Sequence, residues 1–311
     1  MNFRFFLSIL LGKLVHAFSR FFRLGAGATW PGEIAMRIFP VILTQFAKQN
    51  VTVVLVAGTN GKTTTVKMIE TILRAHGIRR VRHNQSGANL ENGLVSAFVS
   101  DAGVWGTLRS RYFIFEVDEA TLPTILPKLT PKILVLTNLF RDQLDRYGEV
   151  DTIAEKWREG LVPLTRATTV IANADDPHIA FIAGKTVATV TYFGLDEAKF
   201  FRTSMQHATD TIYCPQCGAR LTFGGVYFSH LGKWACGSCG FTHPAAAVTA
   251  KDFQSPVEGI YNHYNALAAA LVGRTLRVPD AVIRQGLGNF TPAFGRMEEV
   301  RLRGRTVKIL L

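Results

Sequence analysis

Long apolar runs are absent from this chain of 311 residues. None reaches the ~18–20 apolar residues of a membrane-spanning helix, which excludes an integral membrane protein. Internal repeats and low-complexity segments are also absent. A composition of 48% hydrophobic and 19% charged residues excludes wholesale disorder. At about 150 residues per domain, the length predicts about two domains and a sizeable core.

Acidic residues are scarce relative to basic ones. The chain has 23 Asp and Glu against 35 Lys and Arg, which gives a formal net charge of +12. This balance favours an anionic partner such as a nucleotide, a nucleic acid or a negatively charged membrane surface.

Cysteine is also scarce, and every cysteine lies in one short segment. The four cysteines form two pairs, each enclosing two residues: Cys214 and Cys217, then Cys236 and Cys239. Eighteen residues separate the pairs, which is the spacing of a four-thiolate zinc site without an open coordination position. The pattern therefore predicts a structural zinc. The alternative is two disulfides in a secreted protein, and the nearby His230 and His243 are interpreted as bystanders rather than ligands.

Residues 1–48 have a helical pattern. Apolar residues recur among basic ones at near-helical spacing: Phe5, Phe6, Ile9, Leu10, Leu14 and Phe18. Three interpretations are a signal peptide, a basic amphipathic helix at the inner membrane face, and a helix packed on the next domain. After a break at Trp30-Pro31-Gly32, we expect a second helix over residues 33–49.

From residue 51 onward, short apolar runs alternate with helical patterns. The expected strands are Val51–Ala57, Tyr112–Val117, Ile133–Thr137, Thr169–Ala172 and Val187–Phe193. This alternation predicts a mostly parallel α/β sheet with flanking helices. Residues 200–250 interrupt the alternation and contain the cysteines, so we expect an inserted zinc ribbon there. A helix over Asn262–Val272 then resumes the α/β pattern.

A phosphate-binding loop follows the first expected strand. It is the run Gly58-Thr59-Asn60-Gly61-Lys62-Thr63-Thr64, and a helix follows it. The glycines let the backbone wrap a phosphate, and the amides at the helix start point at it. We expect Lys62 to meet the β- and γ-phosphate oxygens and the Thr63 hydroxyl to bind Mg²⁺. The loop is a variant, because the first glycine of the usual pattern would fall at Val56; the alternative is a chance Gly-Lys-Thr turn.

Polar residues stand at the ends of two further apolar runs. Glu116 comes after the run Tyr112–Phe115, and Asn138 comes after Ile133–Thr137. Ligands of open α/β sheets bind at this carboxyl edge. Because Mg²⁺ prefers carboxylate and phosphate oxygens, we assign Glu116 to magnesium, and we expect Asn138 to position the γ-phosphate or a metal-bound water. The alternatives are a surface carboxylate and a turn residue.

Four motifs, in order, resemble those of the Mur ligase family, which includes the folylpolyglutamate synthases: Ala57–Thr64, Asn173–Pro177, Gly259–Ala269 and Gly295–Glu298. The resemblance implies that Asn173 and Asp175 lie beside the nucleotide, that Asn262 approaches adenine and that Arg296 reaches the γ-phosphate. Without the resemblance, the first two would be interpreted as turn residues and Asn262 as a helix N-cap.

The resemblance also implies a domain organisation. A helical segment, 1–48, would precede a central ATPase domain, 49–298, that holds the ribbon, and residues 299–311 would begin a C-terminal ligase domain. The chain stops inside an apolar run, Val307–Leu311, that looks like the middle of a buried strand. Because termini usually lie at the surface, we expect the sequence to be a fragment that lacks most of this last domain.

Further segments resemble one branch of the family, the synthetase subunits of lipid II isoglutaminyl synthases: His83–Asn89, Phe115–Glu119, Thr137–Glu149 and the cysteine insertion. Gln143 stands where other Mur ligases have a histidine that helps to hold a second Mg²⁺, so the metal site is expected to differ in detail. Lys156 lies near the place of the carbamylated lysine of many Mur ligases and is left unassigned.

The function implied by this resemblance is a carbon–nitrogen ligase of peptidoglycan synthesis that uses ATP, Mg²⁺ and Zn²⁺. ATP would phosphorylate the α-carboxylate of D-glutamate in the lipid II stem peptide, and ammonia would displace the phosphate to give D-isoglutamine. Lys62, Glu116 and Arg296 are the expected catalytic residues. Because every cysteine belongs to the zinc pattern, none is free as a glutaminase nucleophile. Ammonia is therefore expected from a GatD-like class I glutamine amidotransferase in a heterodimer. The implied location is cytoplasmic, at the inner face of the cell membrane. The resemblance implies no nucleic-acid partner.

Two other functions stay open. An amino-acid-adding Mur or folylpolyglutamate ligase would carry the family's histidine and carbamylated lysine, and neither is clearly placed. A zinc-ribbon nucleic-acid-binding ATPase would explain the net charge, but the basic residues are spread along the chain rather than clustered with aromatic residues at the ribbon.

Overall fold

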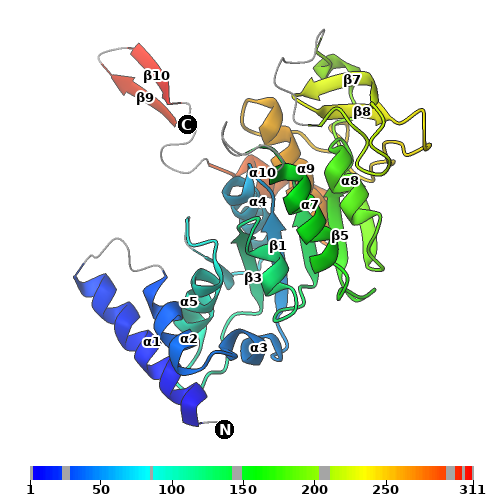
Figure 1. Cartoon of the computed structure of the whole chain (residues 1–311). Coiled ribbons are helices and arrows are strands. Elements are labelled where there is room, and N and C mark those ends of the chain that lie inside the picture. The colour runs from blue at the N-terminus through cyan, green and yellow to red at the C-terminus, as the bar shows by residue number, and fades with distance from the viewer. Residues whose placement is uncertain are drawn as a thin grey trace.

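The computed structural model describes residues 3–22, 29–84, 87–141, 149–202, 211–291, 298–302 and 305–309. Its centre is a six-stranded sheet in the order β2-β3-β1-β4-β5-β6, and each pairing in it is parallel. The strands are β1 (Thr52–Ala57), β2 (Val81–His83), β3 (Tyr112–Val117), β4 (Ile133–Leu136), β5 (Thr169–Asn173) and β6 (Thr189–Phe193). The predicted parallel α/β sheet is confirmed (Figure 1).

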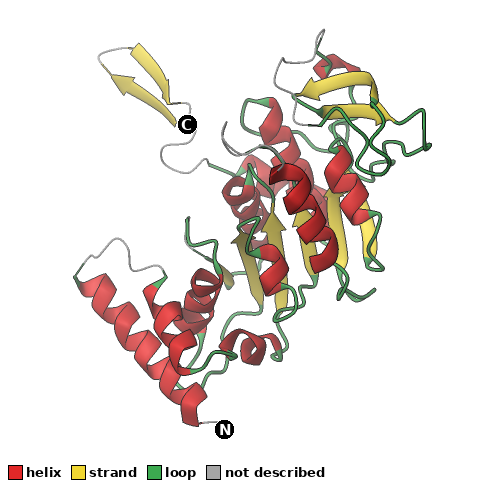
Figure 2. Cartoon of the chain, viewed as in Figure 1, coloured by secondary structure: helices red, strands yellow, loops and turns green. Residues whose placement is uncertain are grey.

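Helices cover both faces of the sheet (Figure 2). One face carries α4 (Lys62–Ala75), α9 (Ile260–Thr275) and α10 (Asp280–Gly288). The other carries α5 (Glu91–Asp101), α6 (Leu122–Ile125), α7 (Glu149–Gly160) and α8 (Pro177–Ala183). Successive side chains of a strand point to opposite faces. Val54 therefore packs with the first group of helices, while Val53 and Leu55 pack with the second.

The N-terminal helices are α1 (Phe3–Phe21), α2 (Trp30–Ile38) and α3 (Ile42–Ala47). Phe5 and Ile9 of α1 join the core on the α5 face of the sheet. The expected single helix over 33–49 is wrong. Helix α2 ends at Ile38, because Phe39, which precedes Pro40, has the non-helical angles φ −137° and ψ 85°. A proline disfavours helical backbone in the preceding residue, which explains the break. Among the described residues, no helix has the length and hydropathy to cross a membrane.

A small hairpin lies within the interrupted segment at 200–250. Its strands β7 (Thr222–Phe228) and β8 (Leu231–Ala235) pair antiparallel, and a short 3₁₀ helix, η1 (Ala198–Phe200), precedes them. A second antiparallel pair, β9 (Glu298–Leu302) and β10 (Arg305–Ile309), comes at the end of the described chain.

The parallel pairing brings the carboxyl ends of the central strands to one edge. Ala57 at the end of β1 pairs with both Val117 of β3 and Leu136 of β4, and Leu136 pairs with Ala172 of β5. The loops that follow these four strands therefore start side by side. These loops carry most of the predicted site residues, at the edge where open α/β sheets bind ligands.

A buried carboxylate fastens the end of α5. The Asp101 side chain, which is 0% exposed, accepts hydrogen bonds from the backbone N–H and hydroxyl of Ser110 at 2.8 and 2.6 Å, and from the Arg109 backbone N–H and Arg82 Nε at 2.9 Å each. Burial alone raises the pKa of Asp101. The hydrogen bonds, those from Ser110 first, outweigh burial and hold the pKa below its ordinary value.

Asp101 is therefore expected to make stability depend on pH. A carboxyl group whose pKa is lowered by folding stabilises the protein above its unfolded pKa, and this contribution is lost as the pH falls through its folded pKa. Asp101→Asn should lower the free energy of unfolding near neutral pH by ~2–3 kcal/mol and make its decline below about pH 5 less steep. Urea unfolding across this range measures both effects. Parallel pH profiles for the variant and the wild type would contradict the assignment.

Candidate functional site at the carboxyl edge of the sheet

Two glycines shape the loop between β1 and α4. Gly58 and Gly61 have φ of +145° and +84°, which L side chains rarely adopt. A Cβ at Gly58 would lie 2.0 Å from Thr137 Oγ1, and one at Gly61 would lie 2.1 Å from Asn265 Oδ1. No side chain fits at either position, so the loop turns closely over the sheet edge into α4. Strand, glycine turn and helix follow one another as a phosphate-binding loop requires.

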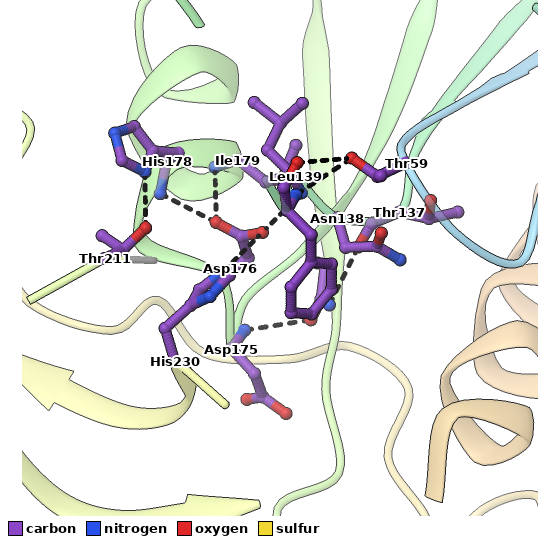
Figure 3. A network of polar contacts seen from close by, with 12 residues as sticks. Thr59, Thr137, Asn138, Leu139, Asp175, Asp176, His178, Ile179, Thr211 and His230 are labelled. Atoms are coloured by element: carbon purple, nitrogen blue, oxygen red, sulfur yellow. Dashed lines mark hydrogen bonds and ion pairs between the residues drawn. The ribbon is translucent and has the colours of Figure 1, made fainter. Parts of the chain in front are cut away.

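Asn138 braces this loop from the end of β4. Its Oδ1 accepts a hydrogen bond from the Asn60 backbone N–H at 2.9 Å, and its Nδ2 donates to the Asn60 carbonyl at 3.1 Å. Thr59 is tied to the same segment, since its hydroxyl accepts a hydrogen bond from the Phe140 backbone N–H at 2.9 Å. Figure 3 shows Thr59 and Asn138 within this polar network. The loop occupies both ends of the Asn138 amide, which supports a loop-positioning role; contact with a phosphate stays a prediction.

The ammonium group of Lys62 folds back over the loop. Lys62–Thr64 form the first turn of α4. Lys62 Nζ donates to the carbonyls of Gly58 and Thr59 at 2.6 and 3.0 Å and lies 3.4 Å from Glu119 Oε2. A cation at the start of a helix, beside the amides of a glycine turn, suits phosphate oxygens. No sequence signal places Glu119 opposite Lys62.

Glu116 and Thr63 bring two oxygens to one point. Glu116 is 3% exposed. Its Oε2 accepts a hydrogen bond from the Thr63 hydroxyl at 2.5 Å, and its Oε1 accepts one from the Gly87 backbone N–H at 3.2 Å. Asn84 holds the Glu116 backbone, accepting from its N–H at 3.0 Å and donating to its carbonyl at 2.9 Å. The two predicted magnesium ligands thus meet beside the loop, and their oxygens fit the preference of Mg²⁺.

The end of β5 and the turn that follows it place Asn173 and Asp175 in the interior, each 0% exposed. Asn173 Nδ2 donates to the Thr137 carbonyl at 2.9 Å. The Asp175 carboxylate accepts a hydrogen bond from the Tyr264 hydroxyl at 2.8 Å and lies 2.6 Å from His243 Nε2. The interpretation as turn residues is confirmed for Asp175 and wrong for Asn173, which ends strand β5. The contact of both residues with a nucleotide stays a prediction.

Asp176 connects this turn to both the hairpin and the segment after β4 (Figure 3). Its Oδ1 accepts hydrogen bonds from two backbone N–H groups of α8, while Oδ2 accepts one from the Leu139 N–H at 2.9 Å and lies 3.3 Å from His230 Nε2. Burial alone raises the pKa of Asp176, but the neighbouring His230 and these hydrogen bonds hold it below the ordinary value. His230 and His243, interpreted as bystanders, therefore dock the hairpin.

The four cysteine sulfurs gather within 4.8 Å of one another. The Cys214–Cys239 and Cys217–Cys236 sulfur pairs lie 3.7 and 3.5 Å apart, and all four cysteines are free. Four thiolates at ~2.3 Å from a tetrahedral zinc lie ~3.8 Å from one another, so this donor set fits zinc. The sulfur separations do not fit the disulfide alternative, whose bond measures about 2.05 Å.

The first turns of α9 lie against the end of the phosphate loop and the start of α4. Its N-cap is Gly259, so the alternative that Asn262 is an N-cap is wrong. Asn262 is buried, and its Oδ1 accepts a hydrogen bond from Asn265 Nδ2 at 3.3 Å; Asn265 Oδ1 in turn accepts one from the Thr65 hydroxyl at 3.3 Å. Asn265 is not among the predicted site residues. Contact of Asn262 with adenine stays a prediction, and Arg296 lies outside the described residues.

The fold is that of a known protein family. Residues 56–273 match the Mur ligase middle domain, and the chain belongs to the Mur ligase family. Within that family its relatives include MurT subunits. The lipid II isoglutaminyl synthase (glutamine-hydrolyzing) subunit MurT of Streptococcus pneumoniae is 31% identical over 100% of this chain, which covers 71% of that protein. The same subunit of Staphylococcus aureus strain COL is 32% identical over 88% of this chain. The chain spans 63% of that relative's length.

Solved structures agree on the fold. A pseudomurein peptide ligase type C from Methanothermus fervidus superposes with a TM-score of 0.63 at 26% identity, covering 83% of this chain and 53% of that one. The MurF ligase of Thermotoga maritima in complex with ADP has a TM-score of 0.59 at 16% identity, covering 88% of this chain and 57% of that one.

Proposed function

We propose that this chain is the ATP-using part of a lipid II isoglutaminyl synthase, which amidates the D-glutamate α-carboxylate of the stem peptide. One observation carries the proposal. The phosphate loop with Lys62 and the Thr63–Glu116 pair lie together at the carboxyl edge of the sheet. The chain that holds them is 31% identical to a MurT subunit over 100% of this chain and 71% of that subunit. The MurF structure named as a complex with ADP supports nucleotide binding by this fold.

The chemistry proceeds in two steps. An oxygen of the substrate carboxylate attacks the γ-phosphorus of ATP, forming an acyl phosphate and releasing ADP. Ammonia then attacks the acyl carbon, so that a C–N bond forms, the C–O bond to phosphate breaks, and the nitrogen loses a proton to solvent. Lys62 and the loop amides hold the phosphates, and Arg296 balances charge on the transferring group. Thr63 and Glu116 would hold Mg²⁺, which supplies positive charge at the β- and γ-phosphates.

The rest of the assembly is part of the same proposal. Residues 49–298 form the ATPase domain with its ribbon at 200–250, the four cysteines hold zinc, and residues 299–311 begin a C-terminal ligase domain. Ammonia comes from a GatD-like glutaminase subunit, because each of the four cysteines of the chain lies in the metal-type cluster. The name of the MurT relatives, as subunits of a glutamine-hydrolysing synthase, supports a partner of this kind.

Reconstitution with the glutaminase tests the proposal. The full-length protein and its partner are incubated with lipid II, ATP and glutamine, and the stem peptide is analysed by mass spectrometry for conversion of carboxylate to amide. We expect conversion that needs both ATP and glutamine. Free ammonia should be able to replace glutamine. ATP consumption with a free amino acid but not with ammonia would overturn the proposal in favour of an amino-acid-adding ligase.

Glu116→Gln tests the magnesium assignment. The amide keeps an oxygen near Thr63 but removes the negative charge, so the Mg²⁺ concentration for half-maximal activity should rise ~10–100-fold while the fold persists. The measurement is a Mg²⁺ titration of ATP-dependent amidation. Glu155→Gln is the matched control, since Glu155 pairs with Arg158 on the exposed surface of α7. An unchanged Mg²⁺ requirement in Glu116→Gln would contradict the role.

A further inference from the structure

Helix α1 has two contrasting faces. On one, Phe5 and Ile9 are 6% and 0% exposed and pack into the core. The other face carries apolar residues at steps of three and four: Phe3, Leu7, Leu10, Leu14, Phe18 and Phe21. Four members of this stripe are far from buried: Phe3 at 72%, Leu14 at 57%, Phe18 at 58% and Phe21 at 81% exposed. Figure 1 shows α1 on the outer side of α2 and α5, away from the sheet.

Neighbouring rings widen the stripe. Trp105, 67% exposed, lies 5.4 Å from Phe6 between ring centroids, and Phe22, 55% exposed, lies 4.4 Å from Phe18. The stripe together with Phe22 and Trp105 is termed the α1 surface. Several exposed apolar side chains gathered on one face mark an interaction site, whereas single exposed apolar residues are ordinary.

The N-terminal segment that contains α1 is rich in basic residues. Residues 1–49 contain six Lys and Arg but one acidic residue, Glu33. Glu33 belongs to α2, where its carboxylate contacts Arg37 Nε at 3.2 Å and Asn92 Nδ2 at 3.3 Å. Helix α1 itself contains Arg4, Lys13 and Arg20 and has no acidic residue. A second copy of the chain would bring like charges together across such a surface, whereas anionic lipid complements both its charge and its apolar stripe.

We propose that the α1 surface docks onto an anionic lipid bilayer. The helix lies along the bilayer surface, its stripe entering the boundary between headgroups and acyl chains and its basic residues meeting the lipid phosphates. Binding along the bilayer surface needs no membrane-spanning helix, and none is present among the described residues. The docking is separate from the ligase reaction, so its test needs neither ATP nor lipid II.

Vesicle sedimentation with the full-length protein tests the docking. Vesicles of phosphatidylglycerol and phosphatidylcholine are compared with vesicles of phosphatidylcholine alone, at low and high salt. The variant Leu14→Ser/Phe18→Ser/Phe21→Ser removes the stripe from positions that are already exposed, so the fold should persist. The matched control is Val162→Ser/Val187→Ser, whose side chains are 70% and 67% exposed elsewhere. Circular dichroism and thermal melting check the fold of each protein.

We expect the wild type and the control to bind the anionic vesicles and to bind phosphatidylcholine vesicles more weakly. The triple variant should bind at least ~10-fold more weakly, because it loses three apolar side chains that would be buried in the bilayer. High salt should weaken binding by the wild type. Equal binding by variant and wild type, or no binding by the wild type, would overturn the proposal. Self-association of the wild type that the triple variant loses, without vesicle binding, would also overturn it in favour of an interface between copies.

Discussion

Lys62→Ala is expected to reduce ATP-dependent amidation of lipid II at least ~100-fold. The Lys62 ammonium lies within reach of two loop carbonyls and Glu119, at the start of α4 where phosphate oxygens would gather. Alanine removes this charge, and the loop amides alone stabilise the transferring phosphoryl group less well. The measurement is the initial rate of amidation by the full-length protein with its glutaminase, alongside nucleotide affinity by calorimetry.

Lys67→Ala is the matched control, since Lys67 lies one and a half turns further along the same helix. The control should keep wild-type activity, and thermal melting checks that both variants are folded. Full activity in a folded Lys62→Ala protein would contradict the phosphate-loop assignment.

The predictable part of the site comes from strands whose ends are marked in the sequence. Short apolar runs separated by helical patterns predict parallel strands, and parallel strands place their carboxyl ends at one edge. Gly58 and Glu116 could therefore be placed together although 57 residues lie between them, and the structure bonds Glu116 to Thr63 as this placement requires. The cysteine spacing likewise predicts a cluster, because two tight turns each aim two sulfurs at one point.

Long-range docking explains what the sequence did not predict. Asp175 and Asp176 precede a proline, a pattern that indicates a turn but not its surroundings. Their partners His243 and His230 lie 68 and 54 residues further on, in an insertion whose position depends on tertiary contacts. Asn138 similarly bonds a loop 78 residues before it. No local periodicity encodes such pairs. The sequence therefore could not predict that His230 and His243 contact these carboxylates, or that Asn138 contacts the phosphate loop.

This network links the cysteine cluster to the phosphate loop. Strand β8 follows His230 and leads directly into Cys236. His230 lies against Asp176, the Asp176 carboxylate accepts the Leu139 N–H, and the next residue, Phe140, donates its N–H to the Thr59 hydroxyl. A second contact strengthens the docking, since Trp234 Nε1 donates to the Ala174 carbonyl at 3.1 Å. A cluster that holds the ends of the hairpin therefore also steadies groups that bond the loop.

Loss of the metal should accordingly weaken both stability and nucleotide binding. In isolated zinc-finger peptides structural zinc contributes ~10–16 kcal/mol to folding, and here the docking contacts of the hairpin retain part of the order. We expect the double variant Cys214→Ser/Cys217→Ser to lose bound zinc, to lower the melting temperature by at least ~10 °C and to weaken ATP binding about 10-fold, the 1.4 kcal/mol scale of one loosened hydrogen-bond chain. Elemental analysis, thermal melting and calorimetry measure the three effects.

Ser238→Ala is the control for the cysteine variant, because Ser238 lies between the cysteines of the second pair and has an exposed side chain. It should keep zinc, melting temperature and ATP affinity unchanged. A zinc-free cysteine variant that melts and binds ATP like the wild type would show that the hairpin is held by Trp234, His230 and His243 alone. A zinc-free variant that melts lower but binds ATP normally would instead separate the two effects, and it would exclude the path through Asp176 and Thr59 as a support of the loop.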